Sequence, residues 1–110
     1  MQDIKEFASF VVDNIGSVNM ANALKLVQNI DLKGTGDGYN VNDFLIAFST
    51  ECSKRARSTY DHNYNTLHSN MSMITLKSLK EITRKTANKQ MVFDMWLFNI
   101  LDLFGVGIDE

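Results

Sequence analysis

The chain has 110 residues, of which 45% are hydrophobic, and it contains a single cysteine, Cys52. These values exclude a disordered chain and a secreted scaffold held by internal disulfides, and they predict one domain over residues 1–110. The net charge of −2 conceals an uneven distribution, because residues 54–89 carry eight basic and two acidic groups while both flanking segments are acidic. The middle of the chain is therefore the segment suited to polyanions or acidic partners.

The sequence also predicts a compartment. The N-terminus lacks the basic start and apolar run of a signal peptide, and the longest apolar stretch, Met91 to Phe104, is too short to cross a bilayer. We expect a cytoplasmic protein without a membrane interaction. The chain has no proline and 11 asparagines, a bias typical of AT-rich coding sequences such as those of low-GC bacteria, phages and some viruses.

The N-terminal segment predicts two helices. Asp3 and Glu6 form a capping box, and apolar residues at helical spacing follow as far as Ile15. Gly16 is predicted to end this helix in the left-handed conformation, and Ser17 to cap the next one. A second apolar stripe runs from Met20 to Ile30, so an N-terminal antiparallel helical hairpin is expected.

Residues 31–40 form a loop with three of the six glycines. Asp31, Thr35 and Gly36 fit positions 1, 5 and 6 of a calcium-binding EF-hand loop, which this segment therefore resembles. Lys33, however, places a cation on ligand position 3, and position 12 falls on Asn42, or on Asp43 with one residue inserted. We expect a glycine-rich connection capped by Asn40, with no metal and no cofactor.

From Asn40 to Phe104 the chain contains neither glycine nor proline, which predicts helix throughout most of this region. The asparagine- and histidine-rich segment 61–70 is predicted to be a break, although the apolar spacing continues across it and one long helix is the alternative. A further helix is expected around residues 74–82. The last helix is expected from Met91 to Phe104, ended by Gly105. The predicted fold is all-α, a compact bundle of five or six helices without strands.

The basic segment is the first candidate site. Lys77, Lys80 and Arg84 share one helix face, and aromatic residues at positions 60, 62 and 64 lie between the bases, where they could stack on nucleobases. An ordinary solvated surface is the alternative. The candidate polyanion-binding set comprises Lys54, Arg55, Arg57, Lys77, Lys80, Arg84, Lys85 and Lys89.

The last helix is the second candidate site. Met91, Met95 and Phe98 fall in the polar arc with Asp94 and Asp102, opposite an arc already filled by core residues. Exposed methionine and aromatic side chains favour an adaptable protein interface. The alternative is that this helix is buried on all sides.

Catalytic signals are weak. Cys52 lies on an apolar stripe, and His62 and His68 are not spaced for one helical face. We therefore expect no enzyme. The predicted function is a protein-binding module (adaptor, inhibitor or assembly subunit) that binds a protein partner or self-associates as an oligomer. The alternative is a nucleic-acid-binding or regulatory protein that uses residues 54–89.

Overall fold

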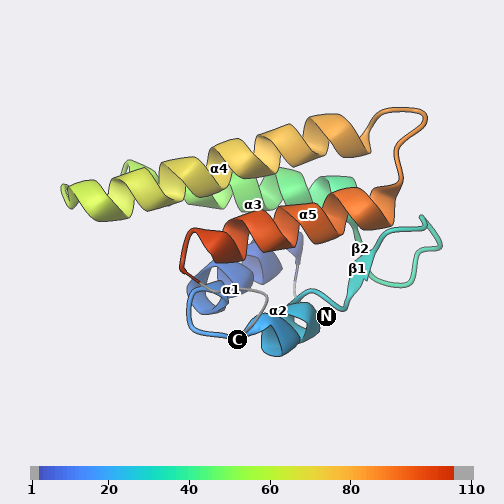
Figure 1. The fold of residues 1–110 in the computed structure, drawn as a ribbon, viewed down its shortest axis with the longest axis horizontal. Coiled ribbons are helices and arrows are strands. Elements are labelled where there is room, and N and C mark those ends of the chain that lie inside the picture. Colours follow the sequence, from blue (N-terminus) through green and yellow to red (C-terminus); the bar gives the residue numbers. More distant parts are fainter. Residues whose placement is uncertain (1–2, 106–110) are drawn as a thin grey trace.

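The computed structural model describes residues 3–105 and places five α-helices there (Figure 1). The helices are α1 (Ile4–Ile15), α2 (Met20–Leu26), α3 (Val41–Ala56), α4 (His62–Ile82) and α5 (Lys89–Asp102). Strands β1 (Ile30–Asp31) and β2 (Tyr39–Asn40) pair in parallel, with Ile30 opposite Tyr39. The prediction of a mostly helical chain is confirmed, whereas the prediction that it contains no strand is wrong.

The helices pack around α3. Helix α4 lies antiparallel to α3 along its length, α5 returns beside α4, and α1 packs on α3 (Figure 1). Helix α2 makes only a small contact with α1. The dominant helical hairpin is therefore α3–α4, and the expected N-terminal hairpin contributes little, because α2 has only seven residues and buries only Ala23.

Side-chain caps determine where the helices begin. Asp3 accepts a hydrogen bond from the Glu6 N–H (2.9 Å), and Asn40 accepts one from the Asp43 N–H (3.1 Å), which confirms both predicted caps. The prediction that Ser17 caps the second helix is wrong, since Asn19 caps α2 instead. An aspartate or asparagine also caps each of the two remaining helices, Asp61 for α4 and Asn88 for α5.

The chain does break before α4, but at residues 57–61 rather than at 61–70. Asp61 accepts the Tyr64 N–H and starts a helix that continues without interruption to Ile82. Tyr64 and His68 stack within this helix, with ring centroids 4.0 Å apart. Polar composition misled the prediction because helix propensity is a weak preference that such contacts override.

Gly16 follows α1 for a reason the sequence does not reveal. Its φ is −79°, so the predicted left-handed conformation is wrong. A Cβ atom at this position would lie 2.6 Å from Cε1 of Phe104, so a larger residue would require the Phe104 ring, which follows α5, to shift. Gly105, with φ of 78°, does adopt the predicted left-handed conformation.

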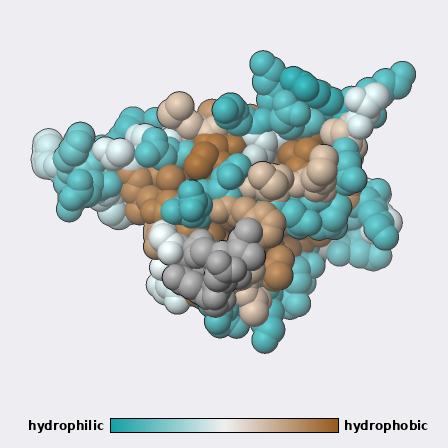
Figure 2. All heavy atoms as spheres, viewed as in Figure 1, coloured by the Kyte–Doolittle hydropathy of each residue, from teal (hydrophilic) through white to brown (hydrophobic). Residues whose placement is uncertain are grey.

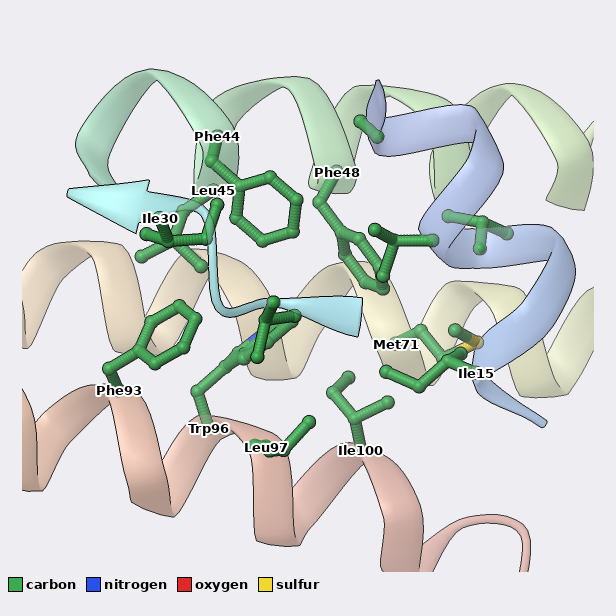
Figure 3. Packing of buried hydrophobic residues seen from close by; sticks show 14 of the residues in the cluster. Ile15, Ile30, Phe44, Leu45, Phe48, Met71, Phe93, Trp96, Leu97 and Ile100 are labelled. Carbon is green, nitrogen blue, oxygen red and sulfur yellow. The ribbon is translucent and has the colours of Figure 1, made fainter. Parts of the chain in front are cut away.

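The core is centred on Trp96 of α5, which is completely buried (Figure 3). Its indole meets the rings of Phe44 and Phe48 edge-on, at centroid distances of 5.7 and 5.1 Å, and lies 5.2 Å from Phe93. The indole N–H donates to Oγ1 of Thr75 on α4 (2.9 Å). One side chain therefore joins α3, α4 and α5.

The Trp96–Thr75 hydrogen bond predicts a specific stability effect. Thr75→Val keeps the shape of the side chain but leaves the buried indole N–H without an acceptor, so it should lower the free energy of unfolding by about 1–3 kcal/mol. In a Trp96→Phe background the same change should cost clearly less, because no indole N–H remains. Urea unfolding of the four proteins measures both costs, and equal costs in the two backgrounds would contradict this account.

Gly38 allows the loop before β2 to approach Asn29. Its φ is 141°, and a Cβ atom there would lie 2.2 Å from the carbonyl oxygen of Asn29, which accepts the Tyr39 N–H (2.9 Å). Gly34 also has a positive φ (73°), but no atom lies within 4 Å of its would-be Cβ. Both glycines have a positive φ, but they lie in different parts of that range, and only Gly38 meets another backbone segment.

We expect Gly34→Ala to cost about 1–2 kcal/mol of stability, the usual penalty for a left-handed alanine. Gly38→Ala should cost more, by about 2 kcal/mol or above, because a φ of 141° lies outside the left-handed helical region and the backbone of Asn29 must move as well. Thermal melts of both variants test the difference. Equal melting temperatures would show that the Asn29 contact is not a constraint.

Candidate functional site

Helix α5 has an apolar surface facing outward as well as one facing the core. Met91, Met95 and Phe98 are 59%, 52% and 37% exposed. The opposite side of the helix is buried through Phe93, Trp96, Leu97, Ile100 and Leu101. The alternative that α5 is buried on all sides is therefore wrong, and three large apolar side chains lie at the surface.

Two acidic residues lie beside this apolar face. Asp94 is half-buried and accepts a hydrogen bond from Nε2 of Gln90 (2.8 Å), whereas Asp102 is exposed. Neither carboxylate is enclosed in the core, so neither needs a buried counter-charge. Both lie at the margin of the apolar face, on a helix whose described residues include one base, Lys89 at its start.

An open groove of about 510 Å³ runs between α4 and α5. From α5 its walls include Met91, Val92, Met95 and Asn99, from α4 they include Lys77, Ser78, Lys80 and Glu81, and Arg84 follows just after α4. Figure 2 shows hydrophobic and hydrophilic surface alternating over this face of the molecule. The sequence predicted the methionines and the bases as two separate candidate sites. The antiparallel packing of α4 and α5 makes them neighbours.

The eight predicted polyanion-binding residues do not share one face. Lys54 and Arg57 lie at the end of α3, before α4 begins, whereas Arg84 follows the end of α4. Since α4 has 21 residues, about 30 Å separates these two groups. Lys77, Lys80, Arg84, Lys85 and Lys89 remain together around the α4–α5 end.

Arg55 has a structural role. Its Nη1 forms an ion pair with Oδ1 of Asp13 (2.6 Å), and its Nη2 donates to Oγ of Ser9 (2.9 Å), so the guanidinium links α3 to α1. Glu51 lies 3.9 Å away on the same side. With two carboxylates beside it, Arg55 is the member of the predicted basic set least able to attract an anion. The sequence does not indicate the contact between Arg55 and Asp13, because the two residues are 42 positions apart in the chain.

The aromatic residues near the basic segment are also separated by the fold. Tyr60 is fully exposed in the turn before α4, whereas Tyr64 stacks on the buried ring of His68. Nδ1 of His68 is 2.9 Å from the carbonyl oxygen of Tyr64. His68 is therefore a packing residue, and the three side chains predicted to stack on nucleobases, those of residues 60, 62 and 64, do not form a row of free rings.

The loop that resembles an EF-hand is organised by Asp31 itself. Oδ1 of Asp31 accepts backbone N–H groups from Lys33, Gly34 and Thr35, and Oδ2 accepts the Gly36 N–H at 2.8 Å. The Gly36 hydrogen bond is the largest cause of a pKa lowered below the ordinary value of 3.8. Within residues 3–105, no three histidine, cysteine, aspartate or glutamate side chains gather where they could hold a metal ion.

Cys52 lies on the core side of α3 with no exposed surface. Burial raises the pKa of its thiol to about 12, so the sulfur stays protonated at neutral pH. A thiolate is the reactive form of cysteine, and this environment disfavours it. The prediction that Cys52 is a buried apolar residue is confirmed.

Comparison of the chain with protein-family models, with curated proteins and with solved structures gives no match. None of the helices described between residues 3 and 105 has both the length and the apolar content needed to cross a membrane. The α4–α5 groove combines two exposed apolar side chains, Met91 and Met95, with three bases, Lys77, Lys80 and Arg84.

Asp31 predicts an acid-dependent component of stability. Because its pKa is lowered in the folded state, the ionised carboxylate stabilises the fold above the ordinary pKa, and this contribution is lost as the pH falls through the folded-state value. Asp31→Asn should therefore be less stable than the parent at pH 7, and the difference should shrink between about pH 4 and pH 2. Urea melts across this range check the prediction, and a constant difference would refute it.

Proposed function

We propose that this chain is a non-enzymatic protein-binding module, an adaptor, inhibitor or assembly subunit that works through the exposed face of α5. The observation that supports it is the half-exposure of Met91, Met95 and Phe98 on a helix whose other side is occupied by the core. Complete burial of each such side chain is worth about 1.5–3 kcal/mol, so covering the exposed half of all three provides a substantial drive for association. The partner is another protein or a second copy of the chain.

Asp94 and Asp102 fit this proposal at the margin of the interface. Charges at an interface rim add little affinity, but they repel partners of the same charge and so contribute to specificity. The methionines fit as well, because an unbranched thioether side chain adapts its shape to different surfaces. A single buried cysteine accords with a cytoplasmic location, where thiols stay reduced.

A nucleic-acid-binding or regulatory protein is the second candidate, supported by the bases around the α4–α5 end. Two observations favour the protein-binding function over it. The eight bases are divided between two ends of α4, with Arg55 paired to Asp13. The remaining bases border a groove lined by methionines, and phosphate groups gain nothing from such side chains.

The α5 interface is tested by Met95→Glu combined with Phe98→Glu. Both side chains are exposed, so the variant should keep the helical content and melting temperature of the separated chain. It should lose the oligomer or the partner complex, because two charges would be buried at the interface. Sedimentation velocity and circular dichroism measure the two properties, and a photo-crosslinking residue at position 95 identifies the partner in cells.

Leu24→Glu combined with Ile46→Glu is the matched control, since both residues are 49% exposed and lie on α2 and α3. This variant should retain the complex. Survival of the complex in the Met95/Phe98 variant, or equal loss in both variants, would refute an interface on α5. Unfolding of the Met95/Phe98 variant would also refute the interface, because it would show that these two side chains stabilise the fold of the monomer.

A further inference from the structure

The floor of the α4–α5 groove is apolar and adaptable. Met91 and Met95 lie one helical turn apart on α5, and Val92, half-buried between them and the core, completes this wall. From Met91 to Asn99 the groove extends along about 12 Å of helix, which accommodates roughly two turns of a second helix. Grooves between paired helices commonly take the apolar face of an amphipathic helix.

The rim on the α4 side is basic. Lys77, Lys80 and Arg84 contribute three positive charges against one carboxylate, that of Glu81, which lies 3.2 Å from Arg84. Within the part of the chain described, neither Lys77 nor Lys80 forms an ion pair. Two exposed ammonium groups thus border the apolar floor with no carboxylate of their own to neutralise them.

Helix α5 contributes no charged side chain to the groove. Asp94 and Asp102 are on α5 but do not line the groove, so the charges that border it are those of Lys77, Lys80, Glu81 and Arg84 on the α4 side. A helix seated here would place its apolar stripe on the methionines and its acidic residues toward α4. Charge complementarity therefore specifies both the composition and the orientation of the occupant.

A second copy of this chain is a poorer occupant when the two α5 helices pair antiparallel face to face. A two-fold axis of that kind brings α4 of one copy beside α4 of the other, so Lys77 and Lys80 would face the same residues of the partner. Like charges across an interface are unfavourable. An anionic membrane or a nucleic acid would instead meet Asp94 and Asp102 beside the methionines, and would be repelled there.

We infer that the α4–α5 groove binds an acidic amphipathic helix from a different protein, with apolar residues on Met91 and Met95 and carboxylates on Lys77 and Lys80. This inference rests on the proposed function of α5 and narrows the partner to one chemical class. It also predicts a binding affinity that decreases as the salt concentration rises, because the rim charges are exposed.

The probe is a displayed library of random peptides about four helical turns long, selected against the whole protein. The enriched sequences should combine apolar residues at helical spacing with aspartate and glutamate. For a fluorescent synthetic peptide of the best sequence, Lys77→Glu with Lys80→Glu should weaken binding by roughly tenfold or more, because two attractions become repulsions. Lys54→Glu with Arg57→Glu, which reverses two exposed bases at the other end of α4, should change binding by less than about twofold.

Four outcomes would overturn the inference. One is that no peptide is enriched, and another is that the enriched peptides are apolar without acids and bind the Lys77/Lys80 variant equally well. A third is that Met95→Glu leaves peptide binding unchanged. The fourth is that duplex DNA or phosphatidylserine vesicles displace the peptide from the protein without binding the acidic peptide themselves. A polyanion would then be the occupant of the groove. In the first, second and fourth cases crosslinking at position 95 still decides separately whether α5 contacts a protein, so failure of this inference is distinguishable from failure of the proposed function.

Discussion

The burial of Trp96 is the constraint on which the rest of this structure depends. Its ring is enclosed by Phe44, Phe48 and Phe93, and its N–H is satisfied by Thr75. An indole in a core needs both a large apolar enclosure and a polar partner at one edge. Helices α3 and α5 supply the enclosure and α4 supplies the partner, so the rotation of α5 about its own axis is set by this one side chain.

The exposed face of α5 follows from that rotation. With Trp96, Leu97 and Ile100 turned inward, residues about half a turn away must point outward, and these are Met91, Met95 and Phe98. The connection after α4 is short, so α5 runs back beside α4 and brings Met95 next to Lys77. The core thus determines which apolar side chains remain at the surface and which charges they lie beside.

The remaining polar interactions support the scaffold rather than the groove. Hydroxyl groups link α3 and α4, with Oγ of Ser53 2.7 Å from Oγ of Ser72, and Arg55 joins α3 to α1. Asp31 satisfies four backbone N–H groups of its own loop. These groups use their hydrogen-bonding capacity within the protein, whereas Lys77 and Lys80 at the α4–α5 end form no ion pair among the described residues.

The sequence by itself determined the local features of this protein. Asp3 and Asn40 were identifiable as caps because a cap bonds an N–H three residues away. The period of the helix placed Met95 on the side opposite the core residues, whereas its exposure was decided by the tertiary structure. Only the tertiary structure decided the features that join distant segments. Arg55 pairs with Asp13, Gly16 must accommodate Phe104, and the methionines of α5 adjoin the bases of α4. Helical periodicity shows which side of a helix is apolar, but it contains no information about which other helix lies beside that side, because that depends on how the side chains of the whole core fit together.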